Sequence, residues 1–264
     1  MRAVDIKTLE PRLAGQVAFA RSVLETKRDP NSATSLLDWA RLVAPGGLVE
    51  EAALRREIAL IAEARDAPRV AMLTRQYASR FGASLYAADF FRDLARLIAQ
   101  FGLADDPANY QLLSGAAASL PPDGRRDFLL TLAKAAIVNA RLDAASAAAA
   151  EALKSSSPDS VDEARARLYL DAGRLTCDGY DAARADLQAI PTAKLDRSDA
   201  GLLASVRSVA AQLRTTPSAG AVEAQSAQPG EGDKASGAAQ TIGLAEAALK
   251  RTERQAGAAD GSPP

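Results

Sequence analysis

Trp39-Ala-Arg-Leu-Val-Ala-Pro-Gly-Gly-Leu-Val-Glu-Glu-Ala-Ala-Leu-Arg-Arg-Glu57 contains, in order, the end of one helix, a break and the start of another. The break is Pro45-Gly46-Gly47. The second helix starts with Glu50 and Glu51, whose charges suit the positive end of a helix dipole, and we expect Glu51 to pair with Arg55 one turn later. Its core-facing residues share one face: Leu54, Ile58 and Ile61. The stretch therefore predicts a helical hairpin.

The composition favours an all-α protein. The 264 residues are 48% hydrophobic but only 5% aromatic, and alanine is frequent. Small side chains suit closely packed helices, whereas a sheet calls for β-branched and aromatic residues. The net charge of -1 provides no field that would hold a polyanion, so we expect no nucleic-acid partner. No stretch approaches the roughly 20 apolar residues of a membrane span, so we expect no membrane insertion.

Apolar stripes, interrupted by Pro, Gly, Asn and Asp, predict a repeat domain of residues 1–214 that contains five helical hairpins and a closing helix. Every second helix starts near residue 11, 48, 86, 125, 161 or 199, a period of roughly 37 residues that is close to the tetratricopeptide unit. We therefore predict a right-handed, tetratricopeptide-like α-solenoid. Pro121-Pro122-Asp123-Gly124 is interpreted as a turn between two of its helices.

The first predicted helix, residues 11–26, is apolar on more than one side. Its main stripe is Leu13, Val17, Ala20 and Leu24, and Phe19 and Val23 lie away from that stripe. The end repeat of a solenoid needs a polar outer face. We therefore expect that the chain begins inside a longer array and that Met1 is not the true start.

Residues 215–264 lose the helical period and are rich in Ala, Gly, Ser, Pro and Gln, which predicts a disordered tail. Within it, residues 244–255 are Ala-rich and amphipathic but too short to be stable as a lone helix in water. Two interpretations remain open for this segment: a helix that folds on a partner, or residual propensity, which we favour.

The sequence offers little for catalysis. It has no histidine, which excludes Ser-His and Cys-His nucleophiles. Cys177, the single cysteine, has no neighbouring basic cluster to activate it, and we interpret it as an incidental or buried thiol. The paired acids Asp105 and Asp106 flank a predicted helix, where capping explains them. We expect no enzyme activity, cofactor, metal or small-molecule substrate, although an α-helical enzyme using carboxylates stays a third possibility.

Aromatic and arginine side chains are concentrated around residues 77–92, and both types are common anchors of protein interfaces. Core packing explains most of the group, which includes Phe91. The candidate partner-binding residues are Tyr77, Arg80, Phe81, Tyr86, Phe90 and Arg92.

The stretch Leu36-Leu-Asp-Trp-Ala-Arg-Leu-Val-Ala-Pro-Gly-Gly-Leu-Val-Glu-Glu-Ala-Ala-Leu-Arg-Arg-Glu-Ile58, followed by Arg75-Gln-Tyr77, Arg80-Phe81 and Ser84-Leu-Tyr-Ala87, resembles the MotC motility proteins of rhizobia and related alphaproteobacteria. The resemblance is concentrated in about a third of the chain. Gly47 stands where the family tends to have Thr, which removes one side-chain helix cap.

The resemblance implies a non-enzymatic, periplasmic accessory protein of the flagellar motor. Its implied partner is the periplasmic domain of the stator protein MotB, through which it supports torque. The family is exported by an N-terminal signal, and this sequence as written has none, which agrees with a start inside a longer protein. The alternative is a cytosolic tetratricopeptide-like scaffold with a different protein partner.

Overall fold

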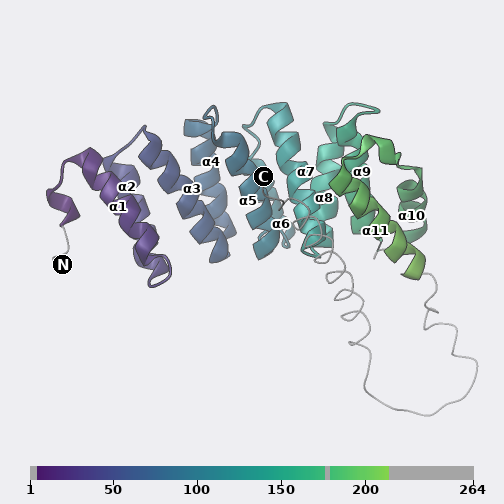
Figure 1. Cartoon of the computed structure of the whole chain (residues 1–264), viewed down its shortest axis with the longest axis horizontal. Coiled ribbons are helices and arrows are strands. Elements are labelled where there is room, and N and C mark those ends of the chain that lie inside the picture. Colours follow the sequence, from purple (N-terminus) through teal and green to yellow (C-terminus); the bar gives the residue numbers. More distant parts are fainter. Residues whose placement is uncertain (1–4, 176–178, 214–264) are drawn as a thin grey trace, which may run out of the picture. The chain divides into compact units, whose positions relative to one another are not determined.

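The computed structural model describes residues 5–175 and 179–213, and within these ranges the regular structure is helical (Figure 1). The chain divides into two compact units, Met1–Arg174 and Leu175–Pro264. The predicted all-α class is confirmed. Cys177, the predicted tail and its 244–255 segment lie outside the described residues.

The first unit contains a short 3-10 helix and nine α-helices in its described part: η1 (Ile6–Thr8), α1 (Pro11–Glu25), α2 (Pro30–Val43), α3 (Leu48–Glu63), α4 (Ala67–Phe81), α5 (Ala87–Phe101), α6 (Pro107–Ala116), α7 (Pro122–Val138), α8 (Leu142–Lys154) and α9 (Val161–Arg174). The described part of the second unit contains α10 (Tyr180–Ala189), η2 (Thr192–Lys194) and α11 (Arg197–Leu213). In that unit, the Arg207 guanidinium donates hydrogen bonds to the carbonyls of Leu187 and Gln188 at the end of α10.

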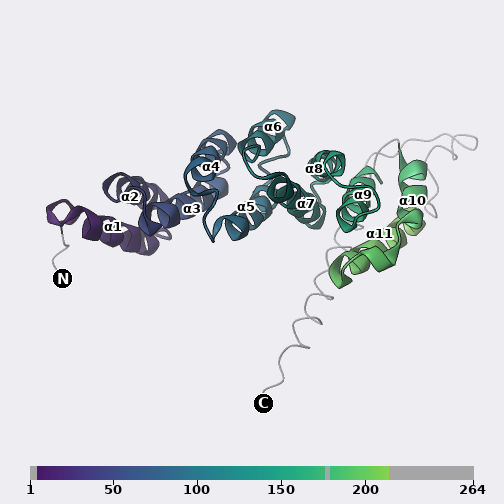
Figure 2. The ribbon, with the colours of Figure 1, turned by 90° about the horizontal axis from the view of Figure 1, so that it is seen from above.

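Within the first unit the hairpins stack in two layers, with α2, α4, α6 and α8 on one side and α3, α5, α7 and α9 on the other (Figure 2). Helices one repeat apart pack together: α3 on α5, α5 on α7, α7 on α9, and α4 on α6. Two ion pairs have the same spacing, because Asp105–Arg141 and Arg126–Asp162 each join residues 36 apart. The expected repeat of helical hairpins is therefore present.

The hairpin formed by α2 and α3 follows the sequence pattern. Gly46 has a φ of +79°, a left-handed conformation that glycine adopts without steric cost. Gly47 is the N-cap of α3 and makes no side-chain capping bond. The Glu50 carboxylate accepts the Gly46 N–H at 2.6 Å instead, so an acid of the first turn satisfies a backbone donor of the break.

The expected Glu51–Arg55 pair is not formed among the described residues, and both side chains have other partners. The Glu51 carboxylate is buried and accepts a hydrogen bond from the Tyr77 hydroxyl at 2.8 Å. The Arg55 guanidinium lies 5.0 Å from the centre of the Tyr86 ring, within the range of a cation–π contact. Tertiary contacts have therefore replaced a local pair of small energy.

The buried face of α1 differs from the predicted one. Leu13 and Leu24 are exposed, whereas the buried residues are Ala14, Gly15, Ala18 and Ser22. The reason is the close approach of α2: a Cβ added to Gly15 would lie 2.8 Å from the Ala44 Cβ. Only small residues fit there, so Leu13 and Leu24 face outward, while Val17 and Phe19 are partly buried against the core.

The predicted turn at residues 121–124 is also wrong, because Pro122 is the first residue of α7. The first N–H groups of a helix have no partner inside it, so Pro loses nothing at this position and its fixed φ suits the helix. Among the described helices, none is both long and apolar enough to cross a bilayer.

Candidate functional site

The buried carboxylate of Glu57 connects three helices. Its oxygens accept hydrogen bonds from Arg41 of α2 and, at 3.0 Å, from Arg69 of α4. Both arginines also contact Asp38. Burial raises the pKa of Glu57 by more than the two guanidinium groups lower it. Since every charge in this cluster has a partner, we interpret it as part of the fold.

Two of the predicted partner-binding residues belong to the core. Tyr77 has no exposed surface, and its ring centre lies 4.0 Å from that of Phe90, which is 5% exposed. Phe91 packs edge-on against both rings and against Phe128 of α7. Burial, reinforced by the hydrogen bond to Glu51, raises the pKa of Tyr77. These aromatics join α4, α5 and α7, and their burial leaves them almost no surface for a partner.

The other predicted residues keep some exposed surface. The Arg80 side chain is 43% exposed and donates to Glu50 at 2.8 Å. Tyr86 is 47% exposed beside Arg55. Arg92 pairs with Asp89, which raises the pKa of Arg92, and Phe81 is partly buried. These exposed groups are distributed over α4 and the start of α5, and the contacts above engage Arg80, Tyr86 and Arg92 within the fold.

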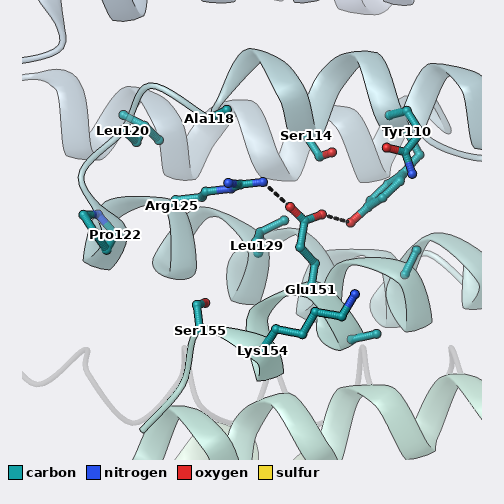
Figure 3. Close-up of a pocket in the computed structure, with 13 residues that line it drawn as sticks. Tyr110, Ser114, Ala118, Leu120, Pro122, Arg125, Leu129, Glu151, Lys154 and Ser155 are labelled. Atoms are coloured by element: carbon teal, nitrogen blue, oxygen red, sulfur yellow. Dashed lines mark hydrogen bonds and ion pairs between the residues drawn. The ribbon is translucent and has the colours of Figure 1, made fainter.

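A groove lies elsewhere, between α6 and α8, and α7 forms its floor (Figure 3). It arises because α6 packs on α4, whereas α8 packs on α7 and α9. Its volume is about 740 Å³, within the usual range of ligand pockets. The apolar part of its lining is made mostly of small residues: Ala118, Leu120, Pro122, Leu129, Ala147 and Ala150.

A carboxylate bridges the groove. Glu151 of α8 accepts a hydrogen bond from the hydroxyl of Tyr110 on α6 at 2.8 Å and pairs through its other oxygen with Arg125 of α7 (Figure 3). Tyr110 is only 6% exposed, and burial together with the bond to Glu151 raises its pKa. The three side chains therefore hold α6, α7 and α8 in position around the opening.

The groove also carries positive charge that its own carboxylate does not neutralise. Arg125 gives one N–H to Glu151, while its Nε finds no acceptor among the described residues. Lys154 lies one turn after Glu151 on α8, is exposed, and has no hydrogen-bond or ion-pair partner in the described chain. The lining thus offers two cations against one carboxylate, whose two oxygens both accept hydrogen bonds.

Sequence reasoning did not single out Arg125, Glu151 or Lys154. One local feature of the sequence could have indicated this site: Glu151 is the only charged residue in the Ala-rich run from Ala144 to Leu153. An acid inside an otherwise apolar helix segment is a sign of a specific polar partner. The partner itself comes from another hairpin, so the sequence gives no indication of which residue it is.

The described chain contains no group of three or more Cys, Asp or Glu side chains that could hold a metal ion.

The fold and the groove define the class of this protein: an all-α protein of stacked helical hairpins with a polar groove in one layer. The family model described as "Chemotaxis protein MotC" matches residues 1–262. The chain therefore belongs to the MotC family, whose description carries a chemotaxis name.

A curated relative supports this assignment. Chemotaxis protein MotC of Rhizobium meliloti (strain 1021) is 33% identical over 190 residues, which cover 70% of this chain and 42% of the relative. The chain thus spans less than half the length of the relative that it matches. No solved structure matches the chain.

Proposed function

We propose that this protein is a non-enzymatic accessory of the flagellar motor that acts in the periplasm, binds the periplasmic domain of MotB and supports torque. The observation that carries the proposal is the match of the MotC family model to residues 1–262. A stack of helical hairpins is a suitable architecture for a binding protein, because it presents an extended surface to a protein partner without any catalytic group.

The structure adds support of a general kind. The polar contacts around Glu57 and the aromatic core around Tyr77 are explained by folding. The groove between α6 and α8 carries two cations, of which Arg125 pairs with Glu151 while Lys154 has no partner in the described chain. A recognition surface is therefore a better account of its chemistry than a reaction centre.

The direct test is calorimetric titration of the purified chain with the periplasmic domain of MotB from the same organism at physiological salt. Saturable binding supports the proposal. Absence of binding by a chain with a cooperative thermal transition counts against it. Arg92→Glu should weaken binding if the exposed arginines of α4 and α5 contribute, with Lys27→Glu, an exposed lysine between α1 and α2, as the control.

The alternative is a cytosolic scaffold with a different protein partner. Fractionation of cells that express the full-length protein under its own promoter separates the two. Release by osmotic shock together with periplasmic markers supports the motor role. Retention with cytosolic markers, combined with unchanged swimming speed after deletion of the gene, favours the scaffold.

A further inference from the structure

We propose that the groove between α6 and α8 binds a short extended segment of a protein partner, and that Lys154 and Arg125 recognise an acidic side chain of that segment. This inference rests on the proposed function in one respect, because it assumes that the repeat unit serves protein binding. It adds the location and the chemistry of the contact.

Charge gives the first argument. Glu151 uses one oxygen for Tyr110 and the other for Arg125, so its single negative charge is already matched by one of the two cations of the lining. Lys154 has no partner in the described chain, and Arg125 keeps a side-chain exposure of 39%. A guanidinium offers five N–H donors in total, and Glu151 engages one of them. The groove therefore favours an anionic group.

Shape gives the second argument. A volume of about 740 Å³ accommodates a few residues of extended chain, whereas a helix with side chains is about 10 Å wide and needs a longer trough. Apolar side chains cover one part of the wall, and Gln111 and Ser114 of α6 provide polar groups beside them. An extended segment with an acid next to a small or medium apolar residue matches both parts of this lining.

The rigidity of the groove gives the third argument. It opens where α6 leaves α8, so the even-numbered layer is interrupted there while α5, α7 and α9 remain packed. The bridge of Glu151 with Tyr110 and Arg125 spans this interruption (Figure 3). The opening is thus held in shape before a partner arrives, which reduces the entropy lost on binding.

The test is a selection of displayed random peptides on the immobilised full chain, followed by affinity measurements on the peptides that are enriched. We expect enriched peptides to carry Asp or Glu next to an apolar residue, and to bind less tightly as salt is raised. Lys154→Glu should weaken them on the order of tenfold, because it replaces an attraction with a repulsion. The control is Lys27→Glu, which makes the same charge change away from the groove and should leave affinity unchanged.

Lys154 is exposed and makes no contact that folding needs, so its variant should keep the circular dichroism spectrum and the melting temperature of the wild type. Arg125→Gln, which removes the second cation, should weaken the same peptides. Enrichment of peptides without acids, no enrichment at all, or equal binding by wild type and Lys154→Glu would overturn the inference.

The MotB titration separates this inference from the proposed function. If the MotB domain binds wild type and Lys154→Glu equally, the groove is not its binding site and the inference is overturned, while the proposed function stands. If MotB does not bind the wild type, the proposed function fails, and the peptide selection alone decides whether the groove takes acidic segments.

Discussion

Glu57→Ala should lower the free energy of unfolding by about 3 kcal/mol. Glu57 has no exposed surface, and the Arg41 side chain that it binds is only 13% exposed. Removing one partner of a buried ion pair costs about 3–5 kcal/mol, because the other charge stays buried without compensation. Arg41 retains Asp38 at 3.1 Å and Gln76 at 2.8 Å, so we expect the lower end of that range. The loss is a large fraction of the roughly 5–15 kcal/mol that stabilises a typical protein.

Urea unfolding followed by far-ultraviolet circular dichroism measures this difference. Glu63→Ala is the matched control, since Glu63 lies on the same helix but is exposed, and it should cost less than about 0.5 kcal/mol. The double variant Arg41→Met, Glu57→Leu should recover most of the loss, because it removes both charges and fills the space. Equal, small effects of Glu57→Ala and Glu63→Ala would refute the view that α2, α3 and α4 depend on a desolvated charge cluster.

The same carboxylate should make stability depend on pH. Burial raises the pKa of Glu57 in the folded chain above its ordinary value of 4.5, so the folded state binds this proton more tightly than the unfolded state. The contribution of Glu57 to stability therefore falls as pH rises from 4.5 through its folded pKa. Glu57→Gln lacks this component. Across this interval the urea midpoint of the wild type should fall relative to that of Glu57→Gln as pH rises. A constant difference, or a relative rise, would contradict the raised pKa.

Two further substitutions test the packing around the groove and the close approach of helices. Tyr110→Phe removes the 2.8 Å hydrogen bond to Glu151 and should cost about 1 kcal/mol, measured as a lower melting temperature; no change would show that the bridge does not hold α6. Gly173→Ala places a Cβ 2.2 Å from the Ser146 hydroxyl and should cost about 1–3 kcal/mol. Adding Ser146→Ala should restore part of that loss in the same assay, and an unaffected Gly173→Ala would mean that α8 and α9 separate easily.

The helix boundaries could be predicted from the sequence because local chemistry sets them. Helices α1, α3 and α9 begin at the predicted residues, Pro11, Leu48 and Val161. Helix α4 (Ala67–Phe81) shows how local chemistry sets such a start. Asp66 caps its first turn by accepting the Arg69 N–H at 3.0 Å. Such signals act within four residues, so the sequence contains all the information needed to interpret them.

Helix faces were harder to predict, since burial depends on how closely another helix approaches. On α3 the large apolar residues face the core as expected, and Leu54 and Ile58 have no exposed surface. On α1 the fully buried residues are small, because Gly15 approaches Ala44 closely, and the larger Val17 and Phe19 are only partly buried. Hydrophobicity identified the helix in both cases, but the spacing of the helices determined the buried face.

The groove could not be predicted because it depends on how helices from different hairpins pack. In the even-numbered layer α6 packs on α4, whereas α8 packs on α7 and α9. Nothing in the local sequence of either helix specifies this. Glu151 alone indicated that a polar partner was needed, and Tyr110, which supplies it, lies 41 residues earlier in the chain.

The residues that make the family resemblance recognisable largely coincide with those that hold α2, α3 and α4 together. Between Leu36 and Ile58 they include the partners of buried or bridging contacts: Asp38, Arg41, Glu50, Glu51 and Glu57. Tyr77 and Arg80 complete the contacts from α4. Changing one member of such a cluster leaves another polar group buried without its partner. Folding alone is therefore a sufficient reason for these residue types at these positions. The stretch therefore identifies the family without locating its binding surface. The more informative comparison is Lys154→Glu against Arg92→Glu, because the groove retains a cation that folding does not use.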